Sequence, residues 1–200
     1  MKNDGARRIG ARFLGVAALV VLTACSATRL TDVRQEPGHA TGPFRRVVVF
    51  AFGTDGATDR LTEDEFVHRL PATTRGVSGH GLVPRAEQGD VARVRDRLRA
   101  EGYDGVIVVW LTSSGEARPD TFRAFGEAYA AAQQNAQRVG DARDGGTVRL
   151  RTLVYSVAAD ALVWSASSRP VAPDDLRETT AGIARLVMER LQEAGLLTET

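Results

Sequence analysis

The chain has 200 residues, of which 43% are hydrophobic and 26% are charged, with 26 basic and 25 acidic side chains. The first 24 residues hold four of the bases and one of the acids, so residues 25–200 hold 22 bases and 24 acids. This balance excludes the concentrated basic surface of a nucleic-acid-binding protein. The single cysteine excludes an internal disulfide and a cysteine-rich metal site.

Residues 1–24 are predicted to form a secretory signal peptide. The segment "MKNDGARRIGAR" is basic, and "FLGVAALVVLTA" after it is apolar throughout. A helix that crosses a bilayer needs about 20 apolar residues, so this shorter run has the length of a signal-peptide core instead. The residues after Arg7 and Arg8 fit twin-arginine export poorly, which favours general secretion.

The tetrad Leu22-Thr23-Ala24-Cys25 closes the apolar run and resembles the bacterial lipobox. The resemblance implies that diacylglycerol is attached to the sulfur of Cys25, that a peptidase cuts before Cys25, and that the new amino group receives a fatty acyl chain such as palmitate. Several acyl chains together give stable anchoring where one is marginal. By the same resemblance, Ser26 is compatible with sorting to the outer membrane. An ordinary signal peptide and an uncleaved anchor are the alternatives.

Residues 25–43 are polar and mixed in charge, and they contain proline and glycine, so we expect a flexible tether. Residues 44–200 are expected to form one periplasmic domain, because the length of the mature chain suits a single core. Its first apolar run, Val47–Phe52, is continuous and rich in β-branched and aromatic residues. That pattern predicts a strand covered on both faces, as in an α/β sheet.

The next elements follow from helix and strand signals. Residues 61–70 are predicted to be a short helix, with Thr62 and Glu65 at the spacing of a capping box. Residues 81–87 are predicted to be a short edge strand. The remaining predictions are a helix over 91–100 capped by Asp90 and closed by Gly102, a buried strand over 104–114, a hairpin of strands over 147–157 and 161–168, and a long helix over 173–197.

The predicted order is β-α-β-α-β, an insert, and β-β-α, which indicates an α/β (α+β) fold with one mixed sheet. The segments "RRVVVFAF", "GYDG" before "VIVVWL", "YSVAADALVWSASS" and "IARLVMERLQEAGLL" resemble the small α/β domains of bacterial envelope lipoproteins. That group includes the amino-terminal domain of TolB, the CsgG-like proteins and the LpoB-like synthase activators. The resemblance covers about residues 44–197, and it implies architecture and compartment rather than an activity.

The histidines form no recognised metal or catalytic set. We expect His39 to be solvated in the tether and His68 to pair with Asp64, one helical turn before it. The segment "SGHG" suggests Ser78 as a nucleophile beside His80. No GxSxG elbow is present and the sequence places no acid beside the pair, so we expect His80 to lie in a flexible loop.

Two further patterns are interpreted as structural. "GTDG" at 53–56 lacks the signatures of a phosphate-binding loop and is predicted to be a turn. A group of acids lacks EF-hand spacing and is predicted to be a solvated loop rather than a cation site; its members are Asp55, Asp59, Glu63 and Asp64. We therefore expect neither a metal nor a cofactor. Trp110 and Trp164 are expected in the core.

Residues 113–146 match no pattern that we can assign. Within them, Phe122, Phe125 and Tyr129 have helical spacing. This amphipathic face is expected either to pack on its own domain or to contact a partner protein or a neighbouring subunit.

Taken together, these features predict a non-enzymatic outer-membrane lipoprotein, anchored through Cys25, whose periplasmic domain binds other envelope proteins or copies of itself. A small periplasmic hydrolase with an unrecognised site is one alternative. A subunit of a ring-forming envelope complex is the other.

Overall fold

The computed structural model describes residues 29–37, 42–53, 55–84, 87, 89–113, 122–141, 147–172 and 176–198. The predicted signal peptide and Cys25 lie outside these residues. In the described part of the chain, no helix is long and apolar enough to cross a membrane.

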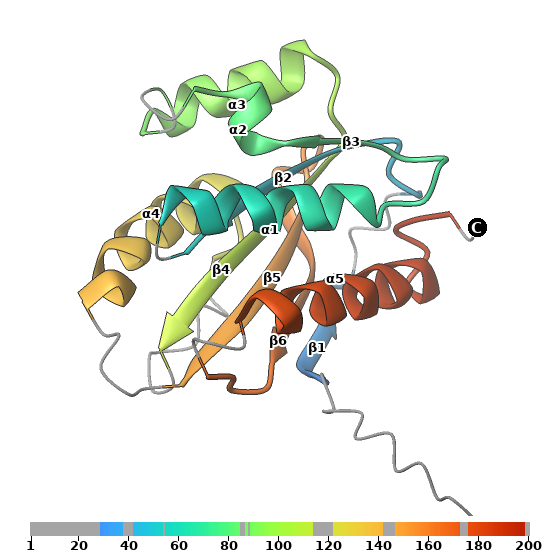
Figure 1. Cartoon of the computed structure of the whole chain (residues 1–200). Coiled ribbons are helices and arrows are strands. Elements are labelled where there is room, and N and C mark those ends of the chain that lie inside the picture. The colour runs from blue at the N-terminus through green and yellow to red at the C-terminus, as the bar shows by residue number, and fades with distance from the viewer. Residues whose placement is uncertain are drawn as a thin grey trace, which may run out of the picture.

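One six-stranded mixed sheet organises the domain, in the order β1-β6-β5-β4-β2-β3 (Figure 1). Strand β2 pairs in parallel with β3 and β4, and the remaining neighbours are antiparallel. The predicted α/β fold is confirmed. The strands are β1 (Leu30–Gln35), β2 (Arg46–Phe52), β3 (Arg75–Ser78), β4 (Gly105–Ser113), β5 (Val148–Ser156) and β6 (Ala161–Ser168).

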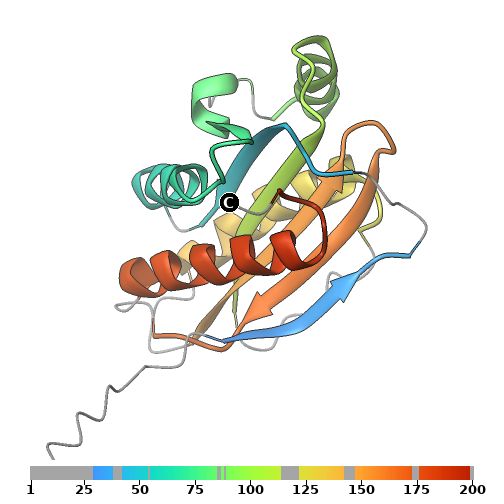
Figure 2. The same cartoon turned by 90° about the vertical axis from the view of Figure 1, so that its right-hand side faces the viewer.

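Helices cover both faces of the sheet (Figure 2). The first face carries α1 and α5, whose Phe66 and Ile183 lie in one apolar cluster. The second face carries α3 and α4, whose Leu98 and Tyr129 lie in another cluster. The helices are α1 (Gly56–His68), the short α2 (Gly79–Leu82), α3 (Val91–Ala100), α4 (Phe125–Asp141) and α5 (Leu176–Glu193).

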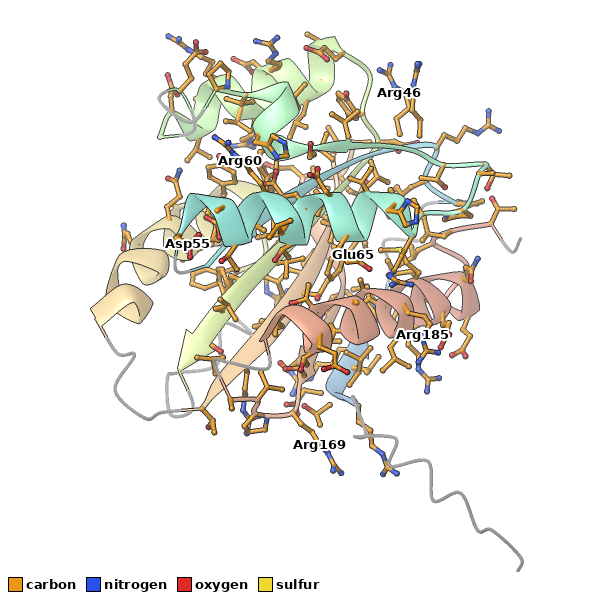
Figure 3. The ribbon with its side chains drawn as sticks, in the orientation of Figure 1. Arg46, Asp55, Arg60, Glu65, Arg169 and Arg185 are labelled. Carbon is orange, nitrogen blue, oxygen red and sulfur yellow. The ribbon has the colours of Figure 1, made fainter. Side chains whose placement is uncertain are left out.

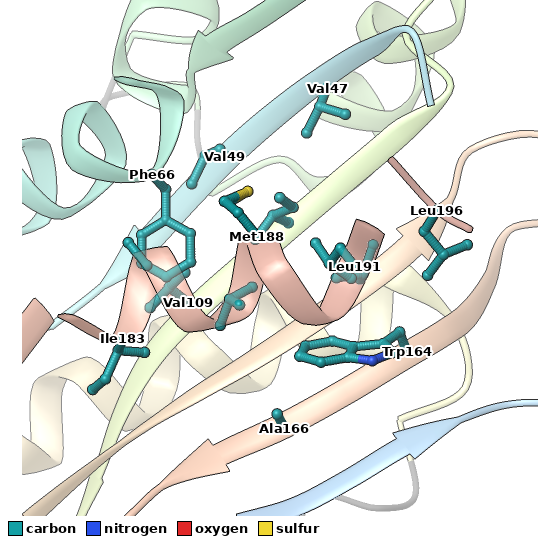
Figure 4. Close-up of a cluster of buried hydrophobic side chains, with 14 of the residues drawn as sticks. Val47, Val49, Phe66, Val109, Trp164, Ala166, Ile183, Met188, Leu191 and Leu196 are labelled. Atoms are coloured by element: carbon teal, nitrogen blue, oxygen red, sulfur yellow. The ribbon is translucent and has the colours of Figure 1, made fainter. Parts of the chain in front are cut away.

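Strand β2 shows why its sequence is apolar without alternation. Its side chains point to opposite faces in turn, so Val47, Val49 and Ala51 enter the first cluster. Val48, Phe50 and Phe52 enter the second. Both faces are buried, as predicted. Figure 4 shows the first cluster, in which Trp164 of β6 lies beneath α5. Trp110 and Trp164 are both buried, as expected.

The first strand corrects the prediction of a tether over residues 25–43. Residues Leu30–Gln35 instead form β1, which pairs with β6 at the edge of the sheet. The ladder is interrupted between Thr31 and Arg34, and Asp32 has a φ of 52°. Two residues there oppose one residue of β6, which is the arrangement of a β-bulge. The strand was missed because its side chains are mostly exposed and polar, as loop residues are.

Two other predicted elements are corrected. The described residues of the strand expected over 81–87 do not form one, since Gly81 and Leu82 belong to the short helix α2, and the second parallel strand is the earlier β3. Helix α1 begins before residue 61, because Asp55 caps it by accepting from the backbone N–H groups of Ala57 and Thr58. By contrast, the helix at 91–100, with its Asp90 cap and Gly102 at a φ of 71°, is confirmed. The β5–β6 hairpin is also confirmed.

Candidate functional site

A buried carboxylate joins three elements where β3 leaves the sheet. The pairing of β2 with β3 ends at Val49 and Ser78, so the β2 backbone beyond Val49 has no strand beside it on that edge. There the backbone N–H of Ala51 donates to Oε1 of Glu63 at 3.1 Å. The backbone N–H of His80, in α2, donates to Oε2 of the same carboxylate at 2.9 Å. Glu63 thus supplies the hydrogen-bond acceptor that a neighbouring strand would otherwise give to Ala51.

The ring of His80 completes the cluster. Its Nδ1 lies 2.6 Å from Oε2 of Glu63, and its Nε2 lies 3.5 Å from Oγ of Ser78. Asp64 is farther away, with Oδ1 at 3.9 Å from Nε2. The Glu63 side chain is only 4% exposed, whereas the His80 side chain is 33% exposed, so solvent reaches the ring and not the carboxylate. The acid contacts Nδ1 of the histidine and the serine hydroxyl lies near Nε2, which is the order of contacts in a serine-hydrolase triad.

Electrostatics at this cluster are set by burial. Loss of solvent raises the pKa of Glu63 above its ordinary value of 4.5, because burial penalises the charged carboxylate. The hydrogen bonds from His80 and Ala51 act in the opposite direction and are the smaller contribution. The charged form of Glu63 therefore depends on these donors being in place.

The cluster changes two sequence predictions. His80 was expected in a flexible loop, but it lies in α2 and is held by Glu63. Asp64 was expected to pair with His68, but it contacts His80, whose Nε2 lies 3.9 Å from Oδ1 of Asp64. Sequence reasoning missed Glu63 because it lies 17 residues before His80. The available signal was an acid three residues before Phe66, on the buried side of a helix.

The acids predicted to form a solvated loop lie instead at the start of α1 and within it, and Glu63 among them is buried. Asp55 caps the helix, where Oδ1 accepts from Thr58 N at 2.8 Å, and Figure 3 shows it at the start of α1. Glu63 is turned into the domain. In the described part of the chain, no group of three or more His, Cys, Asp or Glu side chains is placed to hold a metal ion.

The topology offers a second place for a ligand. Helix α1 follows β2 on one face of the sheet, and α4 follows β4 on the other face. In open α/β sheets, ligands bind at the carboxyl ends of two neighbouring strands whose connections leave to opposite faces, as those of β2 and β4 do. A cavity does lie there, lined by Gly53, Asp59 and Leu111 among others. The cavity has room for about one water molecule and is therefore too small for a nucleotide.

The aromatic side chains predicted as partner contacts belong to the domain's own core. Phe125 and Tyr129 are buried, and the ring of Tyr129 stands edge-on to Phe50 at 5.1 Å between centroids. Phe122 is partly buried and packs against Trp110 at 5.8 Å. Of the two alternatives for this helix, the structure fits packing on its own domain, and these rings do not form an exposed docking face.

A groove runs instead between the edge strand β1 and helix α5. Leu30 and Val33 contribute from β1, Trp164 from β6, and Leu186 and Ala194 from α5 and its end. The groove is bordered by charged side chains that include Arg29, Arg190 and Glu193. Val33 is 44% exposed, and among the described large apolar side chains only Leu61 of α1 is similarly exposed. β1 and α5 therefore present apolar surface to solvent.

The sequence matches no protein-family model and no curated protein. Among solved structures, the fold is similar to a single-substitution variant of the PelC dodecamer from Paraburkholderia phytofirmans, with a TM-score of 0.47 and 16% identity over 86% of this chain and 100% of that chain. It is also similar to TolB from Acinetobacter baumannii, with a TM-score of 0.39 and 11% identity over 83% of this chain and 31% of that chain. Neither similarity assigns an activity or a partner to this chain.

Proposed function

We propose that this chain is a non-enzymatic lipoprotein of the bacterial outer membrane, anchored through Cys25, whose periplasmic domain binds another envelope protein. The anchoring is supported by the basic segment, the apolar run and the tetrad Leu22-Thr23-Ala24-Cys25 in their expected order. The binding is supported by the exposed edge of β1 and the groove beside it.

The edge strand is the observation that carries the proposed binding. Among the strands that the structure describes, β1 pairs with β6 alone, so the backbone groups on its other side face away from the sheet. Such an edge is a template on which another chain adds a strand. Val33 and Leu30 line the groove next to this edge, where they offer apolar contacts to the side chains of an added strand.

The same strand restricts what can bind. The bulge between Thr31 and Arg34 bends the edge, and Asp32 and Arg34 place charges on it. Bulges and charges of this kind protect edges from indiscriminate pairing. We therefore expect an extended segment of a particular envelope protein, with apolar side chains directed into the groove.

Photocrosslinking from Val33 tests this proposal. A photoreactive side chain at position 33 should capture one partner protein in intact envelopes. The same group at Leu61 is a matched control, because Leu61 is also large, apolar and exposed but lies on α1. A single product from position 33 and none from position 61 is expected. Equal products from both positions, or none from position 33, would contradict the proposal. A product made of two copies of this chain would favour the ring subunit.

A second candidate function, ester hydrolysis, is favoured by the Ser78–His80–Glu63 chain of contacts. In that function Oγ of Ser78 attacks an ester carbonyl while Nε2 of His80 takes the hydroxyl proton. His80 then gives the proton to the leaving alcohol, and water releases the acyl group from Ser78. Glu63 holds the Nδ1–H of the ring throughout.

Two variants separate this candidate from the proposed binding function. Hydrolysis of a nitrophenyl ester, and labelling of Ser78 by a fluorophosphonate, should both be lost in Ser78→Ala and in His80→Ala if the cluster is catalytic. Ser78→Ala removes only the partly buried hydroxyl, so the fold is retained. If the wild type neither hydrolyses the ester nor is labelled, the hydrolase is rejected and the cluster is structural.

A further inference from the structure

Three arginines lie close together at one end of the sheet. The backbone N–H of Arg169, just after β6, donates to the carbonyl oxygen of Arg29 at 3.2 Å, which fixes the two residues side by side. Arg149 of β5 lies next to Val148, which forms a bridge with Val171 of the same segment. We call Arg29, Arg149 and Arg169 the arginine edge. Figure 3 shows Arg169 at the lower end of the domain, far from α3.

The guanidinium groups of the arginine edge make no ion pair with the acids that the structure describes. None of the three has a carboxylate within ion-pair distance among the residues that the structure describes, and Arg29 and Arg169 are exposed. Asp32 is the acid on β1 nearest to Arg29 in sequence. Several other arginines do pair with described carboxylates, and these pairs are Arg69 with Glu65, Arg93 with Glu87 and Asp90, Arg95 with Asp160, Arg97 with Glu101, Arg185 with Glu189 and Arg190 with Glu193. The arginine edge is therefore available to an external anion.

The length of chain before β1 places this edge at a membrane if Cys25 carries lipid. Arg29 is four residues after Cys25. A fully extended chain spans at most about 3.6 Å per residue, so the two Cα atoms are at most about 14 Å apart. The lipid on Cys25 holds that residue at the headgroup level. The arginine edge thus stays within reach of lipid phosphates. The short connection also limits which faces of the domain can turn toward the membrane.

We propose that the arginine edge rests on the phosphates of an anionic phospholipid leaflet and so fixes which end of the domain faces the membrane. This inference rests on the proposed lipid anchoring. Arginine binds phosphate through a planar, bidentate arrangement of donors, and basic residues next to an anionic membrane are attracted to it within a Debye length. The β5–β6 hairpin then points away from the membrane, because β6 runs for about 26 Å from its hairpin end to Ser168.

The orientation determines how partners reach the groove. β1 starts at the arginine edge and runs away from the membrane, so the groove between β1 and α5 begins at the bilayer surface. A partner segment that fills it must therefore approach the bilayer surface. A membrane-anchored or membrane-embedded envelope protein meets this requirement directly.

Fluorescent labels at two ends of the domain test the orientation. The probes are single cysteines at Ala172, beside the arginine edge, and at Ala159, in the hairpin turn, and both positions are exposed. The native Cys25 does not compete for label when it is lipidated. The lipidated protein is placed in vesicles of phosphatidylethanolamine and phosphatidylglycerol that contain a nitroxide headgroup lipid. We expect quenching at position 172 to exceed quenching at position 159 roughly threefold or more, because a nitroxide quenches only at close approach and the two positions lie beyond opposite ends of β6, which is about 26 Å long.

Charge variants test the role of the arginines. Replacing Arg29, Arg149 and Arg169 together by Gln should reduce the excess of quenching at position 172, because the short chain to Cys25 alone leaves the domain free to tilt. The control replaces three exposed arginines of another element, Arg93, Arg97 and Arg99 of α3, by Gln and should leave the difference unchanged. Equal quenching at both positions in the wild type, or no effect of the arginine-edge variant, would overturn the inference.

The anchoring is measured separately in the same preparation. Flotation of the protein with the vesicles and the mass of the Cys25 peptide report whether lipid is attached. A protein that floats and carries lipid, yet shows equal quenching, would overturn the inference and leave the proposed function intact. A bare Cys25 would overturn both.

Discussion

Glu63 lies against Ala51 at the point where β3 has left the sheet, and the backbone N–H of Ala51 donates to Oε1 of Glu63 at 3.1 Å. The other oxygen accepts from the backbone N–H of His80. A single carboxylate therefore satisfies two backbone donors that belong to different elements. Since unpaired buried donors are costly, this contact explains why an acid is retained in the core.

Truncating this side chain should destabilise the domain. Glu63→Ala leaves the N–H groups of Ala51 and His80 without their acceptor, which we expect to lower the free energy of unfolding by about 2–4 kcal/mol. Glu63→Gln keeps one acceptor oxygen and should cost less. Urea unfolding of the two variants measures the difference. As a control, Glu65→Ala on the same helix removes only a surface pair with Arg69 and should cost about 0–1 kcal/mol.

The pH dependence of stability should carry the signature of Glu63. Burial raises its pKa above 4.5 in the folded protein, so the folded state binds the proton more tightly than the unfolded state does. Its contribution to stability is then fully present below the unfolded pKa and is lost as pH rises through the folded pKa. The stability of the wild type relative to Glu63→Gln should therefore fall as pH rises from the ordinary carboxyl pKa of 4.5 through the raised pKa of the folded protein.

Three other titratable side chains lie near Glu63 and bear on this measurement. His80 lies against the carboxylate, Asp64 is close to the outer nitrogen of His80, and the phenol of Tyr129 interacts with Glu63 electrostatically. These groups are present in both proteins, so the comparison with Glu63→Gln reports the carboxyl group together with its coupling to them. A relative stability that rises with pH would contradict the direction of the pKa shift.

Gly79 should not tolerate a side chain. A Cβ at this position would lie 2.2 Å from Cδ1 of Phe50, whose ring is fully buried in the second cluster. Gly79→Ala must displace that ring, and we expect a loss of about 1–3 kcal/mol. Gly89→Ala is the control, because nothing lies within 4 Å of its added Cβ. Similar melting temperatures for the two variants would show that β3 and α2 are not packed as described.

Two buried tyrosines should respond differently to loss of the hydroxyl. Burial raises the pKa of both phenols. Tyr155 donates to the carbonyl oxygen of Phe122 at 3.2 Å, so Tyr155→Phe should cost about 1 kcal/mol. The hydroxyl of Tyr129 has no hydrogen-bond partner among the described residues, so Tyr129→Phe should be neutral or stabilising. Thermal unfolding compares the pair, and the opposite order would argue against the described packing of α4.

The sequence predicted the elements whose hydrophobic pattern along the chain matches the burial of their side chains in the fold. β2 and β4 are buried on both faces, and their continuous apolar runs showed it. β1 escaped prediction because only one side of the strand is paired and most of its side chains are exposed. β3 escaped because it has four residues, too few to establish an alternation. Edge strands depend on tertiary pairing, which a local pattern does not contain.

The candidate site was predicted only in part. The pair Ser78 and His80 was visible as neighbours in "SGHG". Their acid was not, because the contact of Glu63 with His80 exists only when α1 packs beside β3 and α2. Phe125 and Tyr129 show the converse, since helical spacing indicates an apolar face but not what covers it.

Mass spectrometry of the amino-terminal peptide, from protein made in cells with its own first 24 residues, tests the central claim of a lipid-anchored module most directly. We predict that the mature chain starts at Cys25 and that this residue carries the mass of a diacylglyceryl group and an amide-linked acyl chain. An intact Met1, or a mature chain with an unmodified Cys25, would contradict the account.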